Sequence, residues 1–311
     1  MHKEELIQTS IRIDSFIHRT PVMKSELLNK IAGAEIWFKC ENFQKMGAFK
    51  MRGAANAMLH LSEEQKQKGV VTHSSGNFAQ AVALSAKNMG IKAYIVMPEN
   101  APQVKVNAVR AYGGEVIQCA STQEARESTA DQIAKERGAT FLHPYNDIHV
   151  VYGQGTAAKE LLEDHPDLNC LLAPIGGGGL ISGTALSARY LGKDCETYGA
   201  EPFGADDAYQ SFTTGVLTAN KTVNTIADGL RTNLGEVTFP IIQKYVKNII
   251  RVEEEEIIIA MKLIWERMKI IIEPSCAVPF AAVLKEKKIF QNKKIGIILS
   301  GGNVDLAKLP F

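Results

Sequence analysis

Short apolar runs alternate with longer amphipathic stretches along most of the chain. Such runs are typical of buried strands, and the amphipathic stretches have the spacing of helices. Their alternation predicts repeated βα units and therefore a largely parallel sheet in an α/β fold. Strands are expected at Glu35–Lys39, Gly69–Thr72, Ala93–Met97, Glu115–Gln118, Cys170–Ala173, Thr197–Ala200 and Lys294–Leu299.

Helices are expected between these strands. The opening residues 6–11 have apolar positions at helical spacing. A helix over Asn77–Met89 follows a Ser-Ser-Gly turn, and a helix over Thr122–Arg137 ends at Gly138, a residue type that commonly ends helices. The acidic run Glu253–Glu256 is interpreted as the solvated first turn of a helix, where carboxylates suit the helix dipole.

The chain has 311 residues, a length at which a single hydrophobic core stops growing. We therefore expect two lobes: a large discontinuous domain over residues 1–64 and 148–311, and a small domain over residues 65–147. A hydrophobic fraction of 45% and a formal net charge of +1 are ordinary for a globular protein. This balance predicts a small-molecule ligand and no nucleic-acid partner.

The five cysteines are scattered and show no C-x-x-C spacing, so reduced thiols are expected rather than zinc or redox chemistry. The N-terminal residues MHKEELIQTS carry charges where a signal peptide has its apolar core, which predicts a cytoplasmic protein. The uncharged run from Cys170 to Ala188 has the length of a membrane span. Its five glycines and Pro174 instead favour a strand, a turn and a helix start, so no membrane partner is expected.

Lys50 follows an aromatic residue in the segment GAFKMRG, at the expected start of a helix. A lysine taken alone is usually a solvated surface residue. At a helix N-terminus, however, the dipole disfavours the ammonium form and lowers the pKa of the amine. Because a partly deprotonated amine can attack an aldehyde, Lys50 is a candidate for Schiff-base chemistry.

Four consecutive glycines stand between a strand pattern and a helix pattern in the segment PIGGGGLISG. The backbone N–H groups of such a turn, together with the helix dipole, can hold a phosphate. The alternative is a plain βα turn. The dinucleotide fingerprint G-x-G-x-x-G fails because Ser182 stands at its last position, which disfavours a nicotinamide-dependent dehydrogenase.

Two further segments place polar side chains after strands. THSSGNFAQAVA puts Ser74, Ser75 and Asn77 at a turn that enters a helix. Hydroxyls and amides there can bind a carboxylate or a phenolate-like oxygen, and the alternative is an ordinary capped helix. In GIILSGGNVD, the hydroxyl of Ser300 can reach a ring nitrogen, although a glycine turn explains the segment equally well.

The segments FQKMGAFKMRGA, THSSGNFAQA, PIGGGGLISG, EPSCAVPFAAVL and LSGGNVDL follow one another over nearly the whole chain. They resemble segments of the fold type II family of pyridoxal-phosphate enzymes, most of all serine racemases and serine/threonine dehydratases, which are ammonia-lyases. The resemblance implies a fold similar to the tryptophan synthase β chain, with two open, twisted, mostly parallel sheets flanked by helices. It also implies a homodimer, with pyridoxal 5'-phosphate bound between the large and small domains.

By this resemblance Lys50 binds the aldehyde of the cofactor, and Ser75 is the acid and base on the opposite face of the substrate. Phe49 packs against the cofactor ring, Asn77 contacts the ring oxygen, and Ser300 meets the ring nitrogen. The residues implied for cofactor binding are Phe49, Lys50, Asn77, Gly176, Gly177, Gly178, Gly179, Leu180 and Ser300. The residues implied for substrate binding are Ser74, Ser75, Asn77 and Arg126.

The segment AEPFGADD resembles the divalent-cation site of the family. Glu201 and Asp207 would supply carboxylates and Ala205 a backbone oxygen, a set that suits Mg²⁺, Ca²⁺ or Mn²⁺. One departure concerns the substrate site, because Phe78 stands where these relatives commonly carry histidine, which removes one substrate contact.

Some relatives also bind ATP near the dimer interface. Four residues fit that pattern, and these are Lys45, Gln80, Tyr112 and Asn303. Met46 and residues 24–26 do not match its serine and threonine contacts, so activation by ATP is not expected.

The reaction that we rank first is β-elimination of water from L-serine or L-threonine, which gives a 2-oxo acid and ammonia. Elimination needs only Lys50 and an acid, whereas racemisation also needs Ser75. The alternatives are serine racemisation and dehydration of 3-hydroxyaspartate, with β-replacement of the cysteine-synthase type less favoured. A cofactor-binding protein without catalysis is a further alternative.

Overall fold

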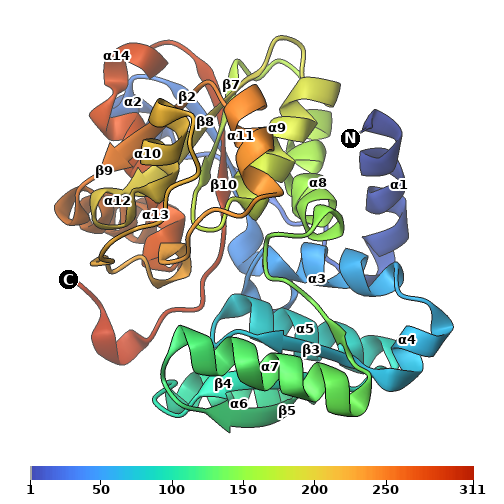
Figure 1. The fold of residues 1–311 in the computed structure, drawn as a ribbon. Helices are drawn as coiled ribbons and strands as arrows, with labels where there is room; N and C mark the ends of the chain where they lie inside the picture. The colour runs from blue at the N-terminus through green and yellow to red at the C-terminus, as the bar shows by residue number, and fades with distance from the viewer. Residues whose placement is uncertain (1) are drawn as a thin grey trace.

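In the computed structural model, which describes residues 2–311, the chain forms two sheets in different parts of the molecule (Figure 1). The larger sheet has the order β1-β2-β10-β7-β8-β9 and is parallel except for the β1/β2 pair. Its strands are β1 Val22–Met23, β2 Glu35–Cys40, β7 Cys170–Pro174, β8 Glu196–Pro202, β9 Asn248–Val252 and β10 Lys294–Leu299. The smaller sheet, β5-β4-β3-β6, is wholly parallel. Its strands are β3 Val70–His73, β4 Ala93–Pro98, β5 Glu115–Cys119 and β6 Thr140–Phe141.

Helices cover both faces of each sheet. On the larger sheet, α2, α12 and α13 pack against one face and α8, α9 and α11 against the other. On the smaller sheet, α5 and α6 lie on one face and α7 on the other (Figure 1). The helices are α1 Lys3–Ile13, α2 Glu26–Ala32, α3 Lys50–Leu59, α4 Glu63–Lys68, α5 Asn77–Met89, α6 Gln103–Ala111, α7 Gln123–Arg137, α8 Ile148–Asp164, α9 Gly179–Leu191, α10 Asp207–Thr214, α11 Thr238–Tyr245, α12 Glu254–Met268, α13 Pro274–Lys285 and α14 Lys287–Phe290.

The central strand β7 is apolar along its whole length because both faces of the sheet are covered there. Every residue of β7 is buried. Cys170 and Leu172 join the core on the α12 and α13 side, whereas Leu171 and Ala173 join the core on the α8 and α9 side. This explains why the strands appear in the sequence as short continuous apolar runs rather than as alternating patterns.

The predicted strands are confirmed as β2, β3, β4, β5, β7, β8 and β10. The predicted helix over Asn77–Met89 is confirmed as α5, and Thr122 is the N-cap of α7, which ends at Gly138 with a positive φ of 67°. Three strands are missing from the prediction: β1 and β6 have two residues each, and β9 has only a short apolar run. The division into domains at residues 65 and 147 stays a prediction.

The five cysteines are free thiols, and four of them are buried. Within residues 2–311, the structure contains no helix that is long and apolar enough to cross a membrane.

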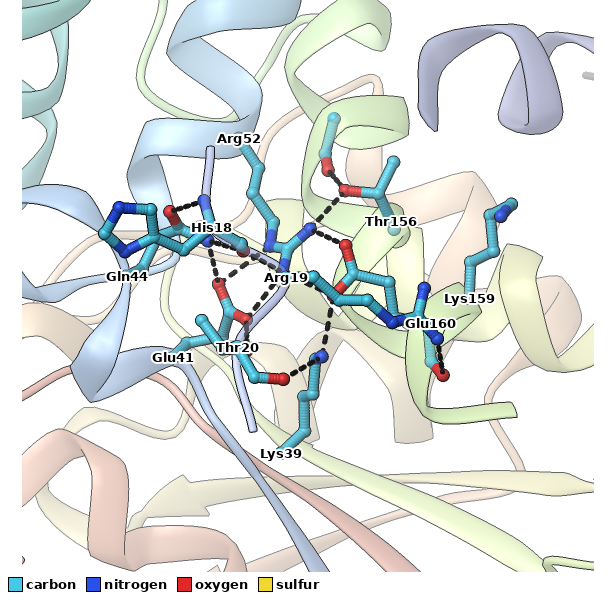
Figure 2. A network of polar contacts seen from close by, with 12 residues as sticks. His18, Arg19, Thr20, Lys39, Glu41, Gln44, Arg52, Thr156, Lys159 and Glu160 are labelled. Carbon is cyan, nitrogen blue, oxygen red and sulfur yellow. Dashed lines mark hydrogen bonds and ion pairs between the residues drawn. The ribbon is translucent and has the colours of Figure 1, made fainter. Parts of the chain in front are cut away.

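Four charged side chains are buried together where β2, α3 and α8 meet (Figure 2). The guanidinium of Arg52 donates to both oxygens of Glu41, at 2.8 Å each, and to both oxygens of Glu160, at 2.7 and 2.9 Å. The ammonium of Lys39 lies 2.6 Å from Glu160 and donates to the carbonyl of Thr20 at 2.7 Å. The two positive and two negative charges therefore balance one another inside the protein. One of the four residues, Arg52, stands two residues after Lys50.

Candidate active site

The ends of four strands bring the predicted site residues into one region. β2, β10 and β7 are adjacent and parallel, so their carboxyl ends lie at one edge of the larger sheet. β2 leads toward Lys50, β10 leads to Ser300, and β7 leads to the four glycines. Asn77, which follows β3 in the smaller sheet, accepts a hydrogen bond from Asn303 at 2.9 Å. Ligand sites of α/β proteins commonly lie at such carboxyl ends.

Lys50 is the first residue of α3, and its side chain is partly buried. Its Nζ donates to the carbonyl oxygen of Pro144 at 2.8 Å and lies 5.1 and 5.6 Å from the ring centroids of Phe49 and Phe78. Burial lowers the pKa of the Lys50 amine to about 8, although the nearby carboxylate of Glu273 acts in the opposite direction. Near pH 8 the amine is therefore partly neutral, which is the form that attacks an aldehyde.

The glycine loop, Gly176–Leu180, is buried and leads into α9. A Cβ on Gly177 would lie 2.2 Å from the ring of Tyr145, and a Cβ on Gly178 would lie 2.7 Å from Oγ1 of Thr238. Gly178 also has a φ of +87°, which favours glycine. Among the described residues no side chain caps α9, so the first N–H groups of this helix lack that partner. A buried, uncapped helix start of this kind can hold an anion.

The serine loop, Ser74–Asn77, leads from β3 into α5. Gly76 is the N-cap of α5, and no side chain in the described part of the chain caps the helix. The hydroxyl of Ser74 accepts a long hydrogen bond from the N–H of Gly76 at 3.4 Å, and Ser75 is partly buried. The start of α5 is therefore not capped by a side chain, as it would be in the alternative of an ordinary capped helix. Hydroxyls and helix N–H groups at such a turn are able to bind an anion.

The carboxamide of Asn77 connects the serine loop to the larger sheet. Its Nδ2 donates to the two carboxylate oxygens of Glu273 at 3.0 and 3.1 Å. Glu273 is 4% exposed, and burial, followed by the charge of Asp228, raises the pKa of its carboxyl to about 7. The Asn77 amide and the buried carboxylate of Glu273 thus lie near Lys50. The charge of this carboxylate partly offsets the lowering of the Lys50 pKa by burial.

Ser300 and Phe49 are held together by the backbone. The N–H of Phe49 donates to the carbonyl of Ser300 at 3.0 Å, and Ala48 and Gly301 form an antiparallel bridge. Ser300 is 2% exposed and directly follows β10. The segment before Lys50 and the segment after β10 are therefore paired through their backbones.

Arg126 is the predicted substrate residue with the fewest contacts to the other predicted site residues. It lies on α7, where its Nη2 donates to Oε1 of Gln123 at 2.5 Å and its Nε to the carbonyl of Thr122 at 3.4 Å. Its charge helps to lower the pKa of His73, after the larger effect of burial. His73 directly precedes Ser74, so the charge of Arg126 lies near the residue before the serine loop.

The predicted cation ligands lie close together at the end of β8, and all three are buried: Glu201 is the second-last residue of the strand, and Ala205 and Asp207 follow it. Burial, and then the charge of Asp207, raises the pKa of the Glu201 carboxyl well above its usual value. Burial also raises the pKa of Asp207 to about 6. Each carboxylate accepts backbone N–H groups, from Ala208 and Tyr209 for Glu201 and from Leu234 for Asp207. Within residues 2–311 no cluster of three or more His, Cys, Asp or Glu side chains surrounds a metal position.

Three contributors to this region are missing from the sequence prediction: Glu273, the Pro144–Tyr145 segment and Thr238. Glu273 carries a local signal, since it directly precedes Pro274 at the start of α13, but this signal predicts only a helix start. Tyr145 and Thr238 carry none, because each contacts the glycine loop across a long stretch of chain.

Comparisons with known proteins agree with this arrangement. A family model described as pyridoxal-phosphate dependent enzyme matches residues 13–301. The chain is 50% identical to serine racemase from Dictyostelium discoideum, over 96% of this chain and 93% of that protein. It is 46% identical to beta-hydroxyaspartate dehydratase from Paracoccus denitrificans, over 99% of this chain and 98% of that protein. A solved threonine deaminase from T.th. has a TM-score of 0.94 and 39% identity, over 99% of this chain and 100% of that chain.

These matches span nearly the whole chain and confirm the predicted α/β fold with two mostly parallel sheets. The names of the relatives include a racemase, a dehydratase and a deaminase. The chain belongs to the family of pyridoxal-phosphate dependent enzymes of fold type II.

Proposed function

We propose that this enzyme acts on β-hydroxy amino acids, with serine racemisation and loss of water from the same substrates sharing one site. The observation that carries this proposal is the partly neutral amine of Lys50 at the edge of one sheet, with the Ser75 loop at the edge of the other. The racemase and hydroxyaspartate dehydratase among the relatives favour these activities over the serine/threonine ammonia-lyase that the sequence ranks first.

The residues present fit pyridoxal phosphate. The glycine loop offers uncapped N–H groups to a phosphate, and a side chain on Gly177 would collide with Tyr145. Phe49 flanks Lys50, and Ser300 lies against the Phe49 backbone, where a hydroxyl suits a ring nitrogen. The cofactor supplies an aldehyde that binds the substrate amine and a ring that withdraws electrons from the α-carbon.

The side chains of the protein would then move the protons. Lys50, once free, takes the α-proton from one face of the substrate as a general base, because its lowered pKa leaves it partly neutral. Ser75 would exchange a proton on the opposite face. Ser74 and the N–H groups at the start of α5 would hold the α-carboxylate. Elimination requires the first of these proton transfers and an acid that protonates the leaving hydroxyl, but it does not require Ser75, so the two reactions depend differently on this residue.

The variant Ser75→Ala tests this division of roles. We expect formation of D-serine from L-serine to fall about a hundredfold or more, and formation of pyruvate to fall less than about tenfold. Chiral separation of serine and an assay of 2-oxo acid measure both products in one reaction. Ser128→Ala, a change on the exposed face of α7, serves as the matched control and should leave both rates unchanged. Equal losses of the two activities would contradict the role proposed for Ser75.

A second candidate function is the dehydration of 3-hydroxyaspartate, and the position of Arg126 favours it. Its charge acts on His73, the residue before the serine loop, and from there the guanidinium could bind a second carboxylate of the substrate. Arg126→Ala is expected to lower kcat/KM about tenfold or more for 3-hydroxyaspartate and much less for serine and threonine. Release of 2-oxo acid from the three amino acids measures this difference. A uniform loss for all three would place Arg126 outside the second carboxylate site.

We further propose a divalent cation at Glu201, Asp207 and the carbonyl of Ala205. The two buried carboxylates repel each other, and a hard cation completed by water ligands would relieve this repulsion. The 2-oxo acid assay is therefore run with added magnesium and with a chelator.

A further inference from the structure

The carboxamide of Asn77 is held from both of its ends. Its Nδ2 lies 3.0 and 3.1 Å from the two oxygens of Glu273, and its Oδ1 accepts a hydrogen bond from Nδ2 of Asn303 at 2.9 Å. Asn303 is itself fixed, because the same nitrogen donates to the carbonyl of Met46 at 2.9 Å. The side chain of Asn77 therefore has one orientation rather than two.

The chemistry of Glu273 determines which orientation this is. The pKa of Glu273 is about 7, so above this pH the carboxyl is mostly ionised and only accepts hydrogen bonds. It must then face the nitrogen of Asn77 and not its oxygen. The amide nitrogen has two N–H groups, and a hydrogen bond to Glu273 leaves the other free to donate to an electron-rich oxygen. Without a carboxylate at position 273, the amide could rotate by half a turn and present its oxygen instead.

We propose that Glu273 is a positioning residue that acts through Asn77, orienting its amide so that an N–H group faces the ring oxygen of pyridoxal phosphate. This inference rests on the proposed function only in that the cofactor binds beside Lys50. It assigns Glu273 no contact with the substrate.

The surroundings of Glu273 favour this role over a purely structural one. Its N–H donates to the carbonyl of Gly301 at 3.0 Å, and a Cβ on Gly301 would lie 2.9 Å from its Oε1, so the carboxylate is fixed next to the Ser300 segment. Among the ion pairs within residues 2–311 none includes Glu273. A buried carboxylate that contacts a neutral amide costs stability, and a fold under no functional demand gains little from it.

A double-mutant cycle with Asn77 tests the proposal. Pyridoxal phosphate is titrated into the cofactor-free full chain, and the dissociation constant is measured from the absorbance of the bound cofactor. Glu273→Gln is expected to weaken binding about tenfold, and Asn77→Ala to weaken it at least as much. The double variant should bind no more weakly than Asn77→Ala alone, because Glu273 acts only through this amide.

The matched control is Glu253→Gln, which changes the N-cap glutamate of α12, a residue with nearly the same backbone angles as Glu273, and should leave the dissociation constant unchanged. If Glu273→Gln does not fold, Asn303→Asp replaces it. An aspartate at position 303 accepts a hydrogen bond from the Asn77 nitrogen instead of donating one to the Asn77 oxygen, so it competes with Glu273 for that nitrogen. Asn303→Asp should therefore weaken binding of pyridoxal phosphate about tenfold, and it should have no effect in the Asn77→Ala background.

Either of two results would overturn the proposal. The first is an unchanged affinity for pyridoxal phosphate in Glu273→Gln, or in Asn303→Asp where that variant replaces it. The second is a loss of affinity that is the same in the Asn77→Ala background as in the wild type. The readout is cofactor affinity, so this inference can fail while the racemase and dehydratase assays succeed, and the reverse also holds.

Discussion

Replacing Lys50 with alanine is expected to lower turnover by about a thousandfold or more, because the variant loses both the amine that binds the cofactor and the general base. The chain should still fold, since the only hydrogen bond that this side chain makes within residues 2–311 is to the carbonyl of Pro144. Turnover of serine and borohydride trapping of the cofactor on the protein measure the two losses separately. Lys68→Ala, which breaks only a surface pair with Glu64, is the control. Substantial turnover by the alanine variant would contradict the assignment of the base.

The same variant tests the pKa of Lys50. The amine has a pKa of about 8 in the folded chain and an ordinary value of 10.5, so between these values the unfolded chain binds a proton that the folded chain does not. The cofactor-free wild type should therefore gain stability relative to Lys50→Ala as pH rises from about 8 to 10.5. The difference in melting temperature between the two proteins, measured across this range, shows the gain. A difference independent of pH would mean that the amine is not desolvated.

Local pattern is sufficient for most of the fold. The strands of each sheet that are buried on both faces, such as β7 and β10, appear as apolar runs bounded by turn residues, and the sequence predicts them. The two-residue strands β1 and β6 carry no pattern of their own, because a pair of residues joins a sheet only where longer strands already provide the edge. The order of the strands, in which β10 lies between β2 and β7, depends on pairings across the whole chain.

The site also has some residues that local sequence patterns predict and others that only long-range contacts bring in. Lys50, the glycine loop and the serine loop stand in short segments whose residue types indicate an amine, a phosphate cradle and hydroxyl donors. Glu273 and Tyr145 reach the site from distant parts of the chain, so no local segment reveals that one contacts Asn77 and the other packs on Gly177. The direction of the Lys50 pKa shift follows from its place at a helix start, but burial is its principal cause in the structure.

Arg52 shows most clearly what the sequence hides, since an arginine is rarely buried without a partner and nothing in its local segment indicates one. It is fully buried, and its guanidinium binds Glu41 and Glu160 with two hydrogen bonds each (Figure 2). These carboxylates come from the segment after β2 and from α8, so the network fixes the start of α3 against both. The position of Lys50 therefore depends on this set of charges.

Arg52→Ala is accordingly expected to destabilise the protein by about 3–5 kcal/mol, because it leaves two buried carboxylates opposite the single ammonium of Lys39. Arg52→Lys should recover only part of this loss, since an ammonium lacks the planar fork that binds both carboxylates. Arg19→Ala is the matched control: Arg19 pairs with Glu163 and Asp164, but its side chain is 50% exposed, so the loss should stay below about 1 kcal/mol. Unfolding in urea measures all three variants. If Arg52→Ala were no less stable than Arg19→Ala, the buried network would not be what holds α3 and Lys50 in place.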